Sequence, residues 1–148
     1  MEFSTGQPLA EYNRIYKETD LLYHNLALRM GLADSELVIL YTLALSGDGC
    51  LQRDIVGNAC LSKQTVNSAL RRMEGDGLIY LESAGRGKDV CLTPEGEALV
   101  QRTAWRVIQA ENQVFAAWPQ ADVEQYLALT RRFQEALAQK AREIKEES

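Results

Sequence analysis

Apolar residues recur every three or four positions along most of the chain, which is the spacing of amphipathic α-helices. These stripes predict helices at 8–30, 34–45, 52–58, 62–76, 94–117 and 120–144. After Gly77 the period changes to two, which predicts strands at 78–82 and 90–92 joined by a tip at 83–89. The pattern therefore indicates a mainly α fold with one small β-hairpin.

The helix that follows Ser62 has the most distinctive pattern. Val66, Leu70 and Met73 share one side, whereas the other side carries amides, hydroxyls and guanidinium groups, with no carboxylate before Glu74. Ser62 is a favourable N-cap residue. Such a face can donate hydrogen bonds to base edges and phosphates, although an ordinary polar surface helix shows the same pattern.

The neighbouring elements favour the DNA-binding interpretation. Cys60 and Leu61 connect the short helix at 52–58 to the helix that Ser62 caps. Because the connection is only a few residues long, the two helices must be neighbours at a large angle. That arrangement is a helix-turn-helix. The helices at both ends of the chain carry apolar stripes, which indicate packing with each other and with a second copy, or packing within one chain.

Three segments together resemble the MarR family of winged helix-turn-helix transcriptional regulators. They are QRDIV from Gln52, LSKQTVNSALRRMEGDGLI from Leu61, and RGKDVCLTPEGEAL from Arg86. The resemblance covers about residues 35–100. It implies a homodimer on a pseudo-palindromic, double-stranded operator, with the helix after Ser62 in the major groove and the hairpin as a wing in the minor groove.

The same resemblance implies one domain over 1–148. Residues 33–100 would form the winged-helix DNA-binding lobe, and 1–31 and 101–148 would form the dimerisation helices. Because most of the family represses, the expected function is that of a ligand-responsive repressor.

The resemblance also implies the residues that contact DNA. Bases or phosphates are contacted from the exposed side of the central helix, phosphates from its N-terminus, and the minor groove from the wing. The residues are Ser62, Lys63, Gln64, Thr65, Asn67, Ser68, Arg71, Arg72, Arg86 and Lys88. Two departures stand out: Ala84 and Gly85 replace the Asp and Arg that often precede the wing arginine, and Leu51 replaces a capping Thr or Ser.

Family members bind small, often aromatic, effectors between the dimer region and the DNA-binding lobe. The candidates for such a crevice are aromatic residues and the single histidine, although aromatic residues at helical spacing are more often part of a core. They are Tyr12, Tyr16, Tyr23, His24, Tyr41 and Trp105.

Composition narrows the remaining classes of function. The net charge is −5, but Glu74 and Asp76 lie at the far end of the central helix, and much of the acidic excess lies elsewhere. One histidine and three cysteines without ligand spacing predict no metal and no cofactor. The sequence shows no catalytic pattern, which predicts a protein that is not an enzyme. Without a leader or a long apolar run, we expect a cytoplasmic location and no membrane partner.

Two alternatives stay open. Oxidation of Cys60, just before the central helix, could release DNA in a thiol-based redox regulator, with Cys50 and Cys91 as the other thiols. Against this, free cysteine usually behaves as a small buried apolar residue. The second alternative is a winged-helix module for protein contacts that does not bind DNA.

Overall fold

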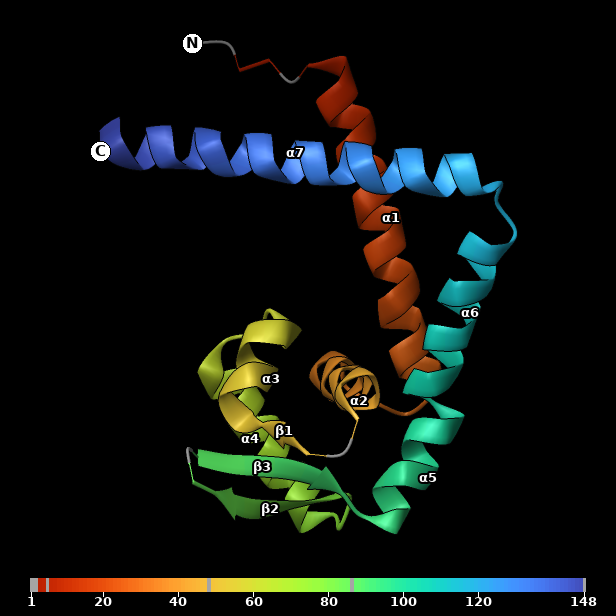
Figure 1. The fold of residues 1–148 in the computed structure, drawn as a ribbon, viewed down its shortest axis with the longest axis vertical. Helices are drawn as coiled ribbons and strands as arrows, with labels where there is room; N and C mark the ends of the chain where they lie inside the picture. Colours follow the sequence, from red (N-terminus) through yellow and green to blue (C-terminus); the bar gives the residue numbers. More distant parts are fainter. Residues whose placement is uncertain (1–2, 5, 48, 86, 148) are drawn as a thin grey trace. The chain divides into compact units, whose positions relative to one another are not determined.

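The computed structural model describes residues 3–4, 6–47, 49–85 and 87–147. They divide into two compact units, one ending at Val107 and the other beginning at Ile108. Figure 1 shows the elements in chain order. The helices are α1 (Gln7–Arg29), α2 (Asp34–Ser46), α3 (Gln52–Ala59), α4 (Lys63–Gly75), α5 (Pro94–Arg102), α6 (Ala104–Ala116) and α7 (Gln120–Glu147).

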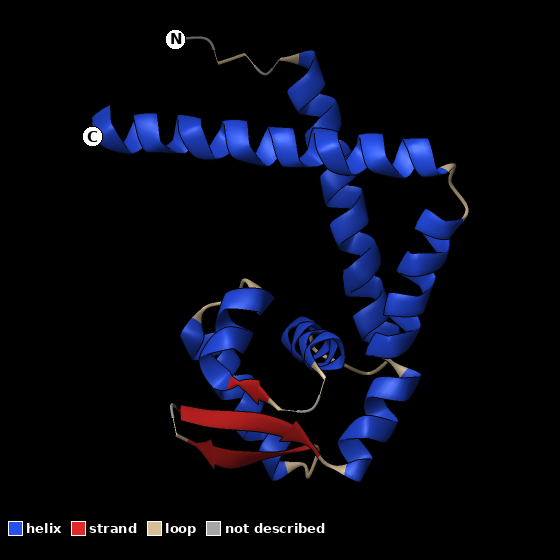
Figure 2. Ribbon diagram, in the orientation of Figure 1, coloured by secondary structure: helices blue, strands red, loops and turns tan. Residues whose placement is uncertain are grey.

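The mainly α fold with a hairpin wing is confirmed. A three-stranded antiparallel sheet, order β1-β3-β2, accompanies the helices of the first unit (Figure 2). The strands are β1 (Cys50–Leu51), β2 (Ile79–Ala84) and β3 (Gly87–Leu92).

Two features of the sheet differ from the sequence prediction. The prediction of a seven-residue tip is wrong. Strands β2 and β3 pair from Ile79 opposite Leu92 as far as Ala84 opposite Gly87, so only two positions separate the strands. Strand β1 was not predicted, because two residues are too few to show a period. It exists through its partner, with Cys50 opposite Val90 and Leu51 opposite Asp89.

The predicted helix at 94–117 is also wrong as a single helix, since it breaks at Thr103 between α5 and α6. Thr103 is buried, and its Oγ1 donates a hydrogen bond to the carbonyl oxygen of Leu99 at 2.6 Å. A regular helix would satisfy that carbonyl with the backbone N–H of Thr103. The hydroxyl replaces it, and the backbone N–H bonds Val100 instead.

One hydrophobic core joins the helices of the first unit to its sheet. Its largest fully buried side chains come from α2, α3, α4 and β3, and they are Ile39, Leu40, Leu43, Ile55, Val66, Met73 and Val90. Because α4 contributes both Val66 and Met73, its apolar side is covered along the whole helix.

The start of α5 is attached to the end of α4. Thr93 caps α5, with its Oγ1 accepting from the backbone N–H of Gly96 at 3.0 Å and donating to the carbonyl of Gly77 at 2.6 Å. A Cβ at Gly96 would collide with the carbonyl oxygen of Leu78. The LTPEG segment thus holds the C-terminal end of α4 through a close backbone approach that requires glycine.

The second unit contains the end of α6, the break at Pro119, and α7. Phe115, Trp118 and Tyr126 cluster there, with ring centroids 5.6–6.1 Å apart. The apolar stripe of α7 is not covered within the single chain. Apart from half-buried Val123, the stripe is exposed at Tyr126, Leu127, Phe133, Leu137 and Ile144.

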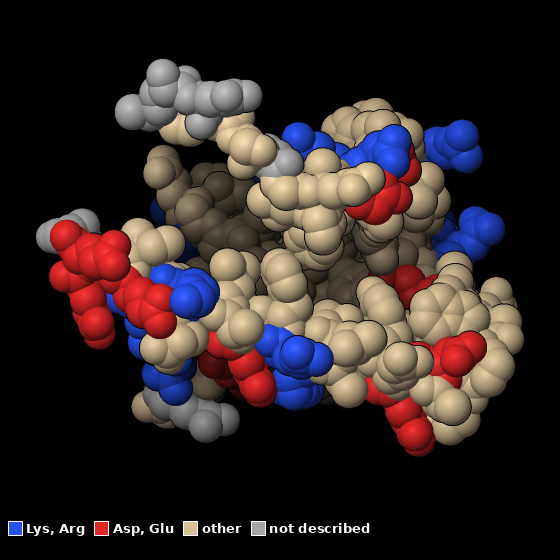
Figure 3. All heavy atoms as spheres, turned by 90° about the horizontal axis from the view of Figure 1, so that it is seen from above, with Lys and Arg blue, Asp and Glu red and all other residues tan. Residues whose placement is uncertain are grey.

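Exposed apolar side chains recur along α1 as well, among them Leu9, Ile15, Tyr16 and Leu22. In Figure 3 uncharged residues cover much of the visible face between separate groups of charged side chains. Among the described helices, none combines the length and apolar character needed to cross a bilayer.

Candidate nucleic-acid interface

Helix α4 is held in its lobe at both ends. At the N-terminus, Ser62 Oγ accepts from the backbone N–H of Thr65 at 3.1 Å and donates to Thr65 Oγ1 at 2.8 Å. At the C-terminus, Gly77 adopts φ +74° and Leu78 N–H donates to the carbonyl of Met73. The capping prediction is confirmed, and the orientation of the helix is set by its buried side and both ends.

Five of the ten residues predicted to contact DNA lie together on the exposed side of α4. Lys63, Gln64, Thr65, Ser68 and Arg71 are all exposed. Over about two and a half turns of helix they offer amide, hydroxyl and cationic groups and no carboxylate. The structure therefore brings these five predicted residues onto one accessible surface.

Next to this surface is a pocket of about 300 Å³ that we call the basic pocket. Its walls come from β1, α3, the first turns of α4 and the start of β3, and they are Leu51, Gln52, Arg53, Val56, Lys63, Asn67, Gly87 and Lys88. Three cations and no carboxylate line it, so it suits an anion such as a backbone phosphate. Lys88 and Lys63, predicted from separate segments, meet here.

The basic pocket also contains two residues that the sequence did not single out as contacts, Gln52 and Arg53. Gln52 Nε2 donates a hydrogen bond to Asn67 Oδ1 at 2.7 Å, and both side chains are half-buried. A helix-turn-helix pattern places α3 beside α4, but it does not state which side chains meet. Only the tertiary arrangement identifies this pair.

Three predicted residues have a different placement. Arg72 lies 3.9 Å from the Glu36 carboxylate, which also accepts from the Ala33 backbone N–H at the start of α2. The Ser62 hydroxyl is occupied by the cap. Arg86 lies outside the described residues, and its role stays a prediction.

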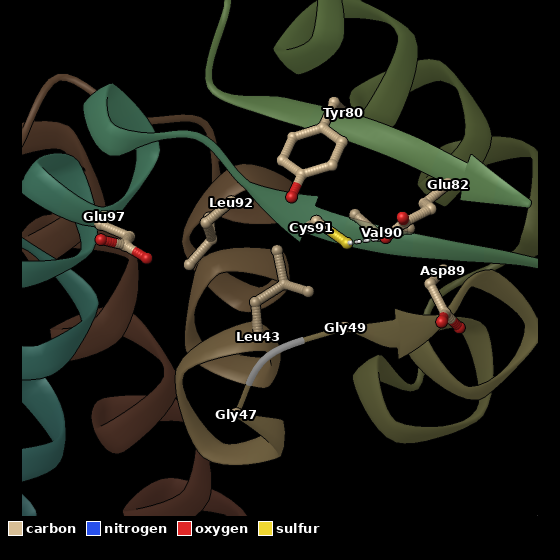
Figure 4. Close-up of a pocket in the computed structure, with 10 residues that line it drawn as sticks. All are labelled: Leu43, Gly47, Gly49, Tyr80, Glu82, Asp89, Val90, Cys91, Leu92 and Glu97. Carbon is tan, nitrogen blue, oxygen red and sulfur yellow. Dashed lines mark hydrogen bonds between the residues drawn. The ribbon is translucent and has the colours of Figure 1, made fainter.

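A second pocket, of about 360 Å³, has the opposite charge, and we call it the acidic pocket (Figure 4). Glu82 on β2, Asp89 on β3 and Glu97 on α5 line it, together with Tyr80 and Cys91. Cys91 Sγ lies 3.9 Å from Glu82 Oε2. Along β3, Lys88 lines the basic pocket and Asp89 lines the acidic one. Phosphate would be repelled from the acidic side.

The six predicted effector residues do not line either pocket. Tyr12 and Tyr16 stack along α1 with centroids 6.2 Å apart. His24 Nδ1 lies 2.9 Å from Asp34 Oδ2 and so links α1 to the start of α2. Tyr41 packs against the core, whereas Tyr23 and Trp105 are partly exposed. The structure thus distributes these side chains over α1, α2 and α6, and an effector site among them stays a prediction.

The cysteines occupy three different environments. Cys50 is buried, Cys91 is half-buried, and Cys60 is exposed at the end of α3 with φ +55°. Within the described part of the chain, no group of three or more His, Cys, Asp or Glu side chains is arranged to hold a metal ion.

No family model and no curated protein sequence matches the chain. A MarR family regulator from Neisseria meningitidis superposes with a TM-score of 0.77 at 22% identity, covering 94% of this chain and 99% of that one. The fold is that of the MarR family.

Two further structures with the MarR fold have known ligands. Staphylococcus aureus MepR in complex with DNA gives a TM-score of 0.69 at 22% identity, covering 85% of this chain and 93% of that one. The DNA binding of Bordetella bronchiseptica BpsR is regulated by 6-hydroxynicotinic acid. Its structure gives a TM-score of 0.64 at 22% identity, covering 90% of this chain and 97% of that one. In this MarR fold, α3 and α4 form the helix-turn-helix and β2–β3 the wing.

Proposed function

We propose that the protein is a transcriptional regulator that binds double-stranded DNA in a sequence-specific manner. The observation that carries this proposal is the single surface formed by the exposed side of α4 and the adjoining basic pocket. Hydrogen-bond donors for base edges lie on α4, and Arg53, Lys63 and Lys88 lie beside them for phosphates. Binding to double-stranded DNA is consistent with a cytoplasmic location of the protein.

We propose further that two copies bind a pseudo-palindromic operator as a homodimer. In support, apolar side chains are exposed along α1 and, separately, along α7. Isolated apolar residues on a surface are ordinary, but stripes of this length mark an interaction surface. A two-fold dimer would cover the same stripes on both copies and repeat α4 at two half-sites.

Regulation by a small aromatic effector, with repression as the outcome, completes the proposal. Its support is the effect of 6-hydroxynicotinic acid on BpsR and the number of aromatic residues on α1, α2 and α6. An effector can change DNA affinity only by binding two dimer geometries unequally, and such coupling is typically about 1–3 kcal/mol. A panel of aromatic acids titrated against the bound operator tests this part.

The deciding experiment is selection of bound fragments from a random DNA pool with the full chain. We expect an enriched pseudo-palindrome, with affinity that falls steeply as salt rises because bound phosphates release counterions. Replacing Lys63 or Lys88 with Ala should lower the salt slope by about one for each lysine. If no sequence is enriched even at low salt, the protein-interaction module replaces the regulator as the better interpretation.

A further inference from the structure

We infer that Gln52 is a positioning residue that sets the orientation of the Asn67 amide and thereby the base that α4 selects. This inference rests on the proposed DNA binding and goes beyond it by naming one chemical preference. Asn67 would present its N–H donors to a base edge, while its carbonyl oxygen is held by the protein.

The contact between the two side chains is specific and comes from separate helices. Gln52 is the first residue of α3, and Asn67 lies fifteen positions later, in the second turn of α4. The distance of 2.7 Å from Gln52 Nε2 to Asn67 Oδ1 is that of a short, well-formed hydrogen bond. Both side chains are half-buried, which restricts their rotamers.

An asparagine amide is ambiguous unless something fixes it. It carries one acceptor oxygen and one NH₂ donor group, and the two ends have nearly the same shape. The hydrogen bond from Gln52 holds the oxygen end. The NH₂ group is therefore the end left for DNA.

A donor-only amide reads a defined set of base edges. In the major groove, guanine offers two adjacent acceptors, N7 and O6, and thymine offers O4, whereas cytosine offers only the N4 donor. An asparagine free to turn would instead suit adenine, which offers one acceptor and one donor. The structure therefore assigns to Asn67 a preference for guanine or thymine and a rejection of cytosine.

Two substitutions at Gln52 separate orientation from simple contact. Gln52→Met keeps the length of the side chain and removes the donor. Gln52→Glu keeps the shape and replaces the donor with an acceptor, so Asn67 must turn its NH₂ group inward and its carbonyl outward. Random-pool selection with the wild type and both variants measures the base preference at every position of the half-site.

In the wild type we expect one base pair at which guanine or thymine is enriched over cytosine. Gln52→Met should reduce that preference by about tenfold, the lower range of what one base contact discriminates, and leave the other positions unchanged. Gln52→Glu should reverse it toward cytosine or adenine. The double variant Gln52→Met, Asn67→Ala should be no less selective at that pair than Asn67→Ala alone, because the two residues act as one unit.

The matched control is Arg53→Met, the next residue on α3, which should weaken binding equally for all sequences. Thermal unfolding of each variant checks that the lobe is folded, and the near-isosteric Gln52→Glu serves if Gln52→Met is unstable. If both Gln52 variants keep the wild-type preference at every position, or weaken all positions alike as the control does, the inference is wrong. If the wild type itself enriches no sequence, the proposed function fails, and the inference with it.

Discussion

Helices α4 and α7 have the same kind of sequence pattern and opposite outcomes. Both carry an apolar stripe at helical spacing, but in α4 the stripe residues Val66, Leu70 and Met73 are no more than 3% exposed. On α7, Phe133 is 46% exposed and Leu137 is 56% exposed. Periodicity therefore states that a helix face is suited to burial, and it does not state which surface covers that face.

The difference has a physical consequence for each helix. The apolar side of α4 already stabilises the lobe, so its polar side is available for the contacts with DNA that we propose. The apolar side of α7 gains little until something covers it, at roughly 25 cal/mol for each Å² removed from water. Substitutions on α4 should therefore divide into those that unfold and those that weaken DNA binding, whereas substitutions on the stripe of α7 should change assembly.

The largest expected effect is from the buried side of α4. Met73 is fully buried among the core residues, so Met73→Ala should lower the free energy of unfolding by about 2–5 kcal/mol, measured by urea denaturation. Gln64→Ala on the exposed side of the same helix is the control and should change it by about 0.5 kcal/mol or less. Equal effects of the two substitutions would contradict the assignment of the two sides.

The exposed stripe of α7 should control assembly. Replacing Phe133 and Leu137 together with Ser should weaken the proposed dimer by about 3–6 kcal/mol, or at least roughly a hundredfold in its dissociation constant. The two-fold dimer carries both changes in each copy, and each of these side chains, about half exposed in the single chain, contributes about half of the roughly 1.5–3 kcal/mol of full burial. Sedimentation over a range of concentrations measures this. The control replaces Arg131 and Glu135, on the opposite side of α7, with Ser. A wild type that is monomeric at all concentrations would refute the dimer.

Two adjacent arginines on α4 should differ in their effect on DNA binding. Arg71→Ala should weaken binding to the selected operator by about 1–3 kcal/mol and leave stability nearly unchanged. Arg72→Ala is the matched control with a smaller expected effect, about 0.5 kcal/mol, because its guanidinium lies beside Glu36. Fluorescence anisotropy with labelled operator measures both. Equal losses would mean that Arg72 leaves Glu36 to bind DNA.

The smallest expected effect concerns the helix cap. Ser62→Ala removes the acceptor for the Thr65 backbone N–H and should lower the free energy of unfolding by about 1 kcal/mol. Ser68→Ala, the same chemical change on the exposed side of α4, should have less than half that effect. If the two serines behave alike in thermal unfolding, the cap does not stabilise α4.

Much of the local structure could be predicted from the sequence, because its causes lie within a few residues. Ser62 caps α4 as predicted, Gly77 follows its end, and the predicted starts at 94 and 120 agree with those of α5 and α7. The same holds for the helix-turn-helix, since the three-residue connection leaves few ways to place α3 and α4. The general surface of the candidate site followed from this local reasoning.

The remaining features depend on contacts between distant residues. Strand β1 exists only because Cys50 and Leu51 meet β3, and the length of the wing depends on its pairing with β2. At the break at Thr103, the buried hydroxyl bonds the carbonyl of Leu99 while the backbone N–H bonds that of Val100. Periodicity predicts none of these three features, because the pattern records which positions are apolar and not which residues they contact.

The candidate site shows the same division most clearly. The sequence by itself determined that α4 has a buried side and a solvent-exposed side, and which residues lie on each. Only the tertiary structure decided that Arg72 faces Glu36, that Lys63 and Lys88 share a pocket, and that Gln52 holds Asn67. The physical reason is that the face of a helix is set by its own repeat, whereas a hydrogen bond of 2.7 Å requires two elements to be placed together by the core.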